Sequence, residues 1–184
     1  MVRGMEKRNF YFILSLIILV VVTRLILLDL RPLHHDEGVN YFFADNIAEG
    51  GGWRYDPTNY HGPLFFFVLA LSFLFLGVSE FSLRLPAALF GIALAVLPLF
   101  LRFKDDKFNT FGKYLCSVFL LLSPSIFYYS RYSIHEVSFV LFSFIGVYLL
   151  SLILEKRDLS YLPYLALCVA LLFTIKETAI IFLL

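Results

Sequence analysis

The sequence predicts an all-α protein that crosses a membrane several times, and three observations carry this prediction. Of its 184 residues, 60% are hydrophobic and only 16% are charged, whereas a soluble domain averages about 45–50% apolar and about 25% charged residues. The mean hydropathy is +0.84. Apolar runs recur along the chain at Phe10–Leu28, Leu64–Leu76, Leu85–Leu101, Phe111–Phe127, Val137–Leu154, Tyr161–Phe173 and from Ala179 onward.

The charge of the chain argues against a nucleic-acid-binding protein. The formal net charge is +1, and no basic patch is interleaved with aromatic residues, so we expect no nucleic-acid partner. The two cysteines, Cys116 and Cys168, lie inside apolar runs and are expected to be small core residues.

The first apolar run, Phe10–Leu28, predicts a retained transmembrane helix. Its roughly 19 residues can span a bilayer, and no small-residue cleavage site follows them. Arg3, Lys7 and Arg8 precede the run, so the positive-inside rule places the N-terminus in the cytoplasm. The chain ends inside another apolar run, and we therefore expect residues 1–184 to be the N-terminal part of a larger transmembrane domain whose C-terminal remainder is missing.

The segment Pro63–Gly77 is expected not to span the membrane. As a helix, its roughly 15 residues would measure about 22 Å, which is less than the about 30 Å of a hydrocarbon core. Pro63 suits the first helical turn and Gly77 suits a C-terminal cap. With this helix at the outer interface, the basic segments Arg102–Lys113 and Lys156–Arg157 become cytoplasmic, as the positive-inside rule requires. We therefore expect about five to six transmembrane helices in an integral membrane protein of the cell membrane or an endomembrane.

Residues 29–77 then form the first extracytoplasmic loop, which contains juxtamembrane helices. Between Gly38 and Glu49 the apolar side chains fall largely on one side, which predicts an amphipathic surface helix; they are Val39, Phe42, Phe43 and Ile47. Three glycines end this helix. The aromatic residues Trp53, Tyr55 and Tyr60 follow, as is typical of a loop anchored at the depth of the lipid headgroups.

Five short polar groupings fall on the outer side in this topology. They are His34–Glu37, His61–Pro63, the pair Glu80 and Arg84, Ser130–Glu136, and Lys176–Thr178. Ionisable side chains are costly at a lipid boundary, so their presence indicates chemistry. A carboxylate kept ionised there by a nearby arginine can act as a general base. Arginines and lysines at the same level can hold a lipid-linked phosphate.

Simpler explanations stay open for these groupings. His34–Glu37 could be a solvated cap at the end of a helix, and Glu80 and Arg84, four residues apart, could form only a local ion pair. The two histidines and two carboxylates at positions 34–37 could also ligate a divalent metal ion. Adjacent residues seldom ligate one ion together, however, unless the backbone turns sharply.

The order of these motifs resembles that of the GT-C glycosyltransferases. The resemblance covers about residues 10–180 and is strongest to the dolichyl-phosphate-mannose protein mannosyltransferases and the aminoarabinose lipid A transferases. Within them the chain looks most similar to an Agl-type, flippase activity-associated family of protein glycosylation. The residues that carry it are Asp36-Glu37, His61-Gly62-Pro63-Leu64, Arg84–Gly91, Ser123-Pro124-Ser125 and Tyr129-Ser130-Arg131 through Glu136.

The resemblance implies a sugar transferred from a polyprenyl-phosphate donor to a protein or lipid acceptor at the extracytoplasmic face. Asp36 would be the general base that deprotonates the acceptor hydroxyl, Glu37 would orient or ligate, and Glu136 would position the base or share a divalent metal with Asp36. Donor binding would fall to Arg131, with Arg84, Lys176 and His61. Two departures are Glu at position 136, where many members have Asp, and Gly62 in place of the commoner Pro or Lys.

Two non-enzymatic functions compete with this interpretation. The same charges could guide a phosphate headgroup in a component that assists the transbilayer movement of lipid-linked sugars. A transporter should place its ionisable residues near the middle of the bilayer or in repeated halves, whereas here they gather at one face without an internal repeat. The chain could also be an assembly subunit of a larger glycosylation complex.

Overall fold

The computed structural model describes residues 2–56, 59, 61–101 and 106–183, with side chains described for 9–56, 59, 61–101 and 111–181. Within these ranges the regular structure is helical, apart from one isolated antiparallel bridge between His61 and Lys176. The all-α prediction is therefore confirmed for this part of the chain. Tyr60, Arg102 and Lys104, which entered the sequence argument, lie outside the described residues.

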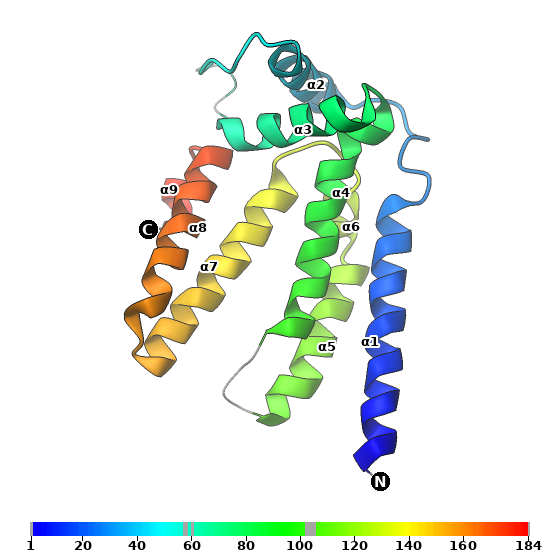
Figure 1. The fold of residues 1–184 in the computed structure, drawn as a ribbon, viewed down its shortest axis with the longest axis vertical. Helices are drawn as coiled ribbons and strands as arrows, with labels where there is room; N and C mark the ends of the chain where they lie inside the picture. The colour runs from blue at the N-terminus through cyan, green and yellow to red at the C-terminus, as the bar shows by residue number, and fades with distance from the viewer. Residues whose placement is uncertain (1, 57–58, 60, 102–105, 184) are drawn as a thin grey trace.

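The helices form a bundle with two helices across one end (Figure 1). The elements are α1 (Val2–Leu25), α2 (His35–Ala48), α3 (Pro63–Leu76), α4 (Glu80–Val96), the 3₁₀ turn η1 (Leu97–Phe100), α5 (Asp106–Leu122), α6 (Pro124–Tyr129), α7 (Glu136–Lys156), the 3₁₀ turn η2 (Leu159–Tyr161), α8 (Leu162–Ile175) and α9 (Ala179–Leu183). Helices α1, α4, α5, α7 and α8 run along the long axis, whereas α2 and α3 lie across its upper end (Figure 1).

Helix α3 has the bounds and the orientation that its length and end residues predict. Pro63 occupies the first turn, and Gly77 ends the helix with φ +75°, a value that glycine adopts without strain. Its 14 residues measure about 21 Å, and it lies across the bundle rather than parallel to α4 and α7 (Figure 1). A short apolar helix in this position covers the end of the bundle without needing to cross a bilayer.

Within the described residues, two helical segments are long and apolar enough to cross a membrane by length and composition, Glu80–Phe100 and Glu136–Lys156. The other apolar helical stretches with described side chains are shorter, among them the Asn9–Leu25 part of α1, so the expected total of five to six spans stays a prediction. The N-terminus of α1 and the turn between α7 and α8 lie at the end opposite α2 and α3 (Figure 1). The assignment of this end to the cytoplasm stays a prediction.

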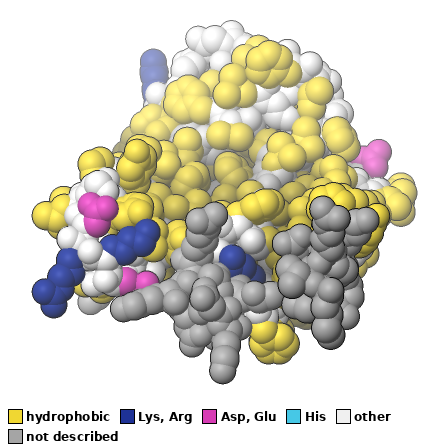
Figure 2. Space-filling model, turned by 60° about the horizontal axis from the view of Figure 1, so that its bottom comes forward, with side chains coloured by type: hydrophobic (Ala, Val, Ile, Leu, Met, Phe, Trp, Pro, Cys, Tyr) yellow, Lys and Arg dark blue, Asp and Glu magenta, His cyan; other side chains and the backbone are white. Residues whose placement is uncertain are grey.

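Large hydrophobic side chains cover the outer flanks of the bundle, as a lipid-facing surface requires. Figure 2 looks at the end where the N-terminus lies and shows them spread over the visible flanks. Examples are Phe10 on α1, Phe119 on α5 and Leu154 on α7, which are 61%, 65% and 70% exposed.

Helix α4 is central to the packing because it contributes to both hydrophobic cores. Leu83, Ala87 and Leu94 join residues of α2, α3 and α7 in one core. Ala95 joins residues of α1 and α5 in the other. A Cβ atom at Gly91 would lie 2.2 Å from the Cβ of Ser130, so a small residue is needed where α4 meets the segment before α7. Close packing thus explains much of the Arg84–Gly91 motif.

Helix α2 exists as predicted, and polar side chains form much of its buried face. Glu37, Asn40 and Ala44 are its buried residues, whereas Phe42 is 67% exposed. The apolar residues of this predicted surface helix are half-buried or exposed, so the helix lies at the surface as expected. Polar side chains could turn inward because each finds hydrogen-bond partners there.

Candidate functional site

The acidic stretch at the start of α2 is organised by its own helix cap. The backbone N–H of His34 donates to Oε2 of Glu37 at 3.0 Å, and the N–H of Asp36 donates to Nδ1 of His34 at 3.3 Å. These bonds satisfy backbone donors that a helix N-terminus leaves without partners. The cap turns the two adjacent carboxylates apart: Glu37 is fully buried, whereas the side chain of Asp36 is 61% exposed.

Glu37 forms a fully buried ion pair with Arg84. Nε of Arg84 lies 2.8 Å from Oε1 and Nη2 lies 3.0 Å from Oε2, with both side chains 0% exposed. The N–H of Ser133 also donates to Oε1 at 3.0 Å. Burial alone would raise the pKa of Glu37, but the hydrogen bonds from Arg84, His34 and Ser133 outweigh it and lower that pKa. Glu37 is therefore ionised and enclosed.

The guanidinium group of Arg84 donates its hydrogen bonds to acceptors within the protein. Besides Glu37, it donates to the carbonyls of Leu28, Arg31 and Pro32 at 3.0–3.2 Å. It also donates to Glu80 at 3.2 Å, so the local pair that their spacing allows is present, but it is not the only ion pair of Arg84. Each of its three nitrogen atoms faces a protein acceptor, so Arg84 ties the segment that follows α1 to α4.

Arg131 caps the C-terminal end of α1. Its guanidinium donates to the carbonyls of Thr23, Arg24 and Leu27 at 2.9–3.3 Å, and the residue is 8% exposed. Free carbonyls at the end of a helix attract a cation. Arg24, on α1, makes a similar contact with another helix: its guanidinium donates to carbonyls in the last turn of α5. The two arginines thereby join α1 to α5 and to the segment before α7.

Ser133 is held at both of its backbone polar groups by one face of α2. Glu37 accepts from its N–H, and Nδ2 of Asn40 donates to its carbonyl at 2.7 Å. Asn40 is 4% exposed. This clamp fixes the segment that leads into α7, and with it the position of Glu136. Sequence reasoning missed Asn40, because a lone asparagine one turn after an acidic pair gives little signal.

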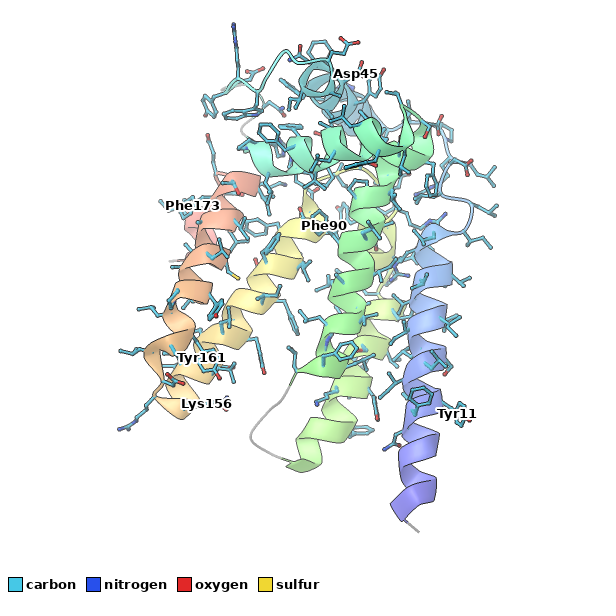
Figure 3. The ribbon with its side chains drawn as sticks, viewed as in Figure 1. Tyr11, Asp45, Phe90, Lys156, Tyr161 and Phe173 are labelled. Carbon is cyan, nitrogen blue, oxygen red and sulfur yellow. The ribbon has the colours of Figure 1, made fainter. Side chains whose placement is uncertain are left out.

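A pocket of about 750 Å³ lies beside this clamp, within the usual size range of ligand sites. Four of the seven predicted site residues line it, namely Asp36, His61, Glu136 and Lys176; Glu37, Arg84 and Arg131 are not among its lining residues. The other lining residues are His35, Val39, Asn40, Phe43, Asp56, Asn59, Tyr129, Ile134, His135 and Thr178. Asp45 projects from the far side of α2, and Lys156 lies at the opposite end of the bundle (Figure 3).

Lys176 and Glu136 form an ion pair in this pocket. Nζ of Lys176 lies 2.5 Å from Oε1 of Glu136, and the two side chains are 23% and 37% exposed. The backbone of Lys176 bridges to that of His61, and the N–H of Gly62 donates to the carbonyl of Ile175 at 3.0 Å. These contacts bring the end of α8 to the pocket.

The glycine of the His61-Gly62-Pro63 motif is explained by this bridge. A Cβ atom at position 62 would lie 2.2 Å from the carbonyl oxygen of Thr174, which is far inside van der Waals contact. Glycine at this position therefore permits a close backbone approach between the first loop and α8.

Two histidines stack face to face at the pocket wall. The rings of His61 and His135 lie 4.1 Å apart at 25°, and His61 Nδ1 lies 2.9 Å from the side-chain oxygen of Asn59. Burial and then Lys176 lower the pKa of His61, and burial, His61 and Lys176 lower the pKa of His135 further. Both rings are therefore neutral at pH 7. His135 is 2% exposed, and its Nε2 has no hydrogen-bond partner among the residues that the structure describes; sequence reasoning assigned it no role.

The described residues do not fit the divalent metal that Asp36 and Glu136 were expected to share. Within the part of the chain that the structure describes, no group of three or more His, Cys, Asp or Glu side chains is placed to hold a metal ion. One oxygen of Glu136 already accepts from Lys176. A bound cation would have to displace that ammonium group.

Comparison with known proteins identifies a family for most of the chain. The family model described as dolichyl-phosphate-mannose-protein mannosyltransferase matches residues 60–184, which include His61, Glu136 and Lys176 and begin after Asp36. No curated protein and no solved structure matches the chain. Because the match covers more than half of the chain, it shows the family.

Proposed function

We propose a specific chemistry for this chain, which belongs to the dolichyl-phosphate-mannose-protein mannosyltransferase family of membrane glycosyltransferases. The family uses a dolichyl-phosphate-linked sugar, and in our proposal the pocket transfers that sugar to a hydroxyl of a protein or lipid acceptor. The pocket faces the extracytoplasmic side, and the chain is of the Agl-type, flippase activity-associated kind. The observation that carries the proposal is that an accessible carboxylate, Asp36, and a lysine, Lys176, line the same pocket.

Asp36 acts as the general base. Its exposed carboxylate takes the proton from the acceptor hydroxyl, and the hydroxyl oxygen uses the freed electron pair to form a bond to the anomeric carbon of the sugar. The bond between that carbon and the phosphate oxygen breaks, and its electron pair leaves with the polyprenyl phosphate. Lys176 donates hydrogen bonds to this phosphate and offsets the charge that develops on it.

The buried ion-pair residues have positioning roles in this proposal. Glu37 and Arg84 hold the turn that presents Asp36, and Arg131 holds the segment before Glu136 against α1. The resemblance implies donor binding by Arg84 and Arg131 together with Lys176 and His61. The donors of the two arginines face protein acceptors, so we assign the phosphate to Lys176.

The proposal is tested by measuring sugar transfer in membranes that contain the protein and a labelled polyprenyl-phosphate sugar. Loss of a general base costs roughly 10²–10⁴-fold in rate, so Asp36→Asn should lower transfer by at least about 100-fold. Asp45→Asn is the matched control, since Asp45 lies on the same helix and does not line the pocket.

Two outcomes of this assay would count against the proposed function. Transfer by Asp36→Asn at the wild-type rate would remove Asp36 from the chemistry. Absence of transfer by the wild-type protein, with movement of the labelled lipid between leaflets, would favour the non-enzymatic alternative of assisting lipid-linked sugars across the membrane.

A further inference from the structure

The pocket offers one strong cation to a phosphate, and a carboxylate already holds that cation. Among the described residues that line the pocket, Lys176 is the one lysine or arginine. Its Nζ lies 2.5 Å from Oε1 of Glu136. Arg84 and Arg131 cannot substitute for it without giving up carbonyl and carboxylate partners of their own.

We propose that the donor phosphate displaces Glu136 from Lys176, so that Glu136 and the phosphate compete for one ammonium group. The inference rests on the proposed function, because it takes the occupant of the pocket to be a lipid-linked phosphate. The exchange changes hydrogen-bond partners only. Nζ of Lys176 gives up Oε1 of Glu136 and donates to a phosphate oxygen, and no covalent bond forms or breaks.

The structure allows this exchange with little movement of the backbone. Lys176 is pinned by its bridge to His61, so the change is confined to its flexible four-carbon side chain. Both partners are partly exposed, and such ion pairs are weakly held. After the exchange Glu136 stays in the first turn of α7, where the helix dipole favours a carboxylate.

The competition gives Glu136 a function at each end of the reaction cycle. When the donor binds, a second carboxylate is set free in the pocket that Asp36 lines, and it becomes available to hold the acceptor. When transfer is complete, Glu136 recaptures Lys176 and weakens the hold on the product, polyprenyl phosphate. A residue that only bound substrate would not act in this second way.

The test is the effect of Glu136→Gln on binding of polyprenyl phosphate. Glutamine keeps the shape and an acceptor oxygen but removes the charge, so Lys176 is released to the phosphate. From the strength of a partly exposed ion pair, the dissociation constant should fall by about two- to fivefold. The purified protein is titrated in detergent micelles with a short-chain polyprenyl phosphate, and in separate arms with the matching polyprenol and with inorganic phosphate.

Two variants separate competition from a general effect of charge. Asp36→Asn removes the same charge from the same pocket and leaves the Lys176–Glu136 pair intact, so its gain should be smaller. Lys176→Met should abolish saturable binding, and adding Glu136→Gln to it should restore none. A parallel gain with inorganic phosphate supports exchange at the headgroup.

Three results would overturn the inference: equal or weaker binding by Glu136→Gln, a gain matched by Asp36→Asn, or tighter binding of the polyprenol, which has no phosphate. Failure of the wild-type protein to bind polyprenyl phosphate would instead count against the proposed function. The binding assay needs no turnover, so the two failures are distinguishable.

Discussion

The buried pair of Glu37 and Arg84 makes the strongest prediction about stability. Glu37→Gln removes a charge from a carboxylate that is 0% exposed and accepts from Arg84, His34 and Ser133. The shape of the side chain is kept, but the guanidinium of Arg84 is left buried without its counter-charge. The amide nitrogen of the new side chain must also face one of these donors, because glutamine has only one acceptor oxygen where glutamate has two.

The expected cost follows from this geometry. Removing one partner of a buried ion pair costs about 3–5 kcal/mol, so the free energy of unfolding should fall by that amount. Glu80→Gln is the matched control, because Glu80 pairs with the same arginine through a side chain that is 42% exposed. An exposed pair is worth no more than about 1 kcal/mol.

The assay is chemical unfolding of the purified protein in detergent, followed at several pH values. The folded pKa of Glu37 is lowered, so its contribution is present above the ordinary glutamate value of about 4.3. It is lost as the pH falls through the lowered folded pKa. Glu37→Gln should lack this loss on the acid side. A cost within about 1 kcal/mol of that of Glu80→Gln would refute the reasoning.

Two further predictions concern the contacts that shape the pocket. Asn40→Asp replaces the donor to the Ser133 carbonyl with an acceptor and should lower the free energy of unfolding by about 1–3 kcal/mol. Asn46→Asp is the control and should change it by less, because the amide of Asn46 donates to the exposed carbonyl of Gly52. Equal costs would contradict the role of Asn40 in holding Ser133. Gly62→Ala should lower the free energy of unfolding by about 1–3 kcal/mol and lower sugar transfer, because its Cβ would meet a backbone carbonyl. Gly38→Ala is the control: Gly38 lies in a helix with open space around it, so this change should be neutral or stabilising by up to about 1 kcal/mol in the same unfolding assay.

Composition and spacing alone determined the class of fold and the bounds of its most informative helix. Apolar runs separated by short polar segments predict a helical membrane bundle, and these are local properties of the chain. Pro63 and Gly77 predicted both ends of α3 because a missing N–H and a positive φ act within one or two residues. Charge placement predicted which polar groupings share one end of the molecule, and the pocket lined by Asp36, His61, Glu136 and Lys176 lies at that end.

Only the tertiary structure decided which charged residues face the pocket and which are enclosed. Asp36 and Glu37 are adjacent and chemically alike, yet one is exposed and the other fully buried. The difference arises because Glu37 meets Arg84, 47 residues away, and Ser133, 96 residues away. A sequence places charges at a level of the membrane, but only helix packing decides whether carbonyls, a carboxylate or open space lies opposite each one.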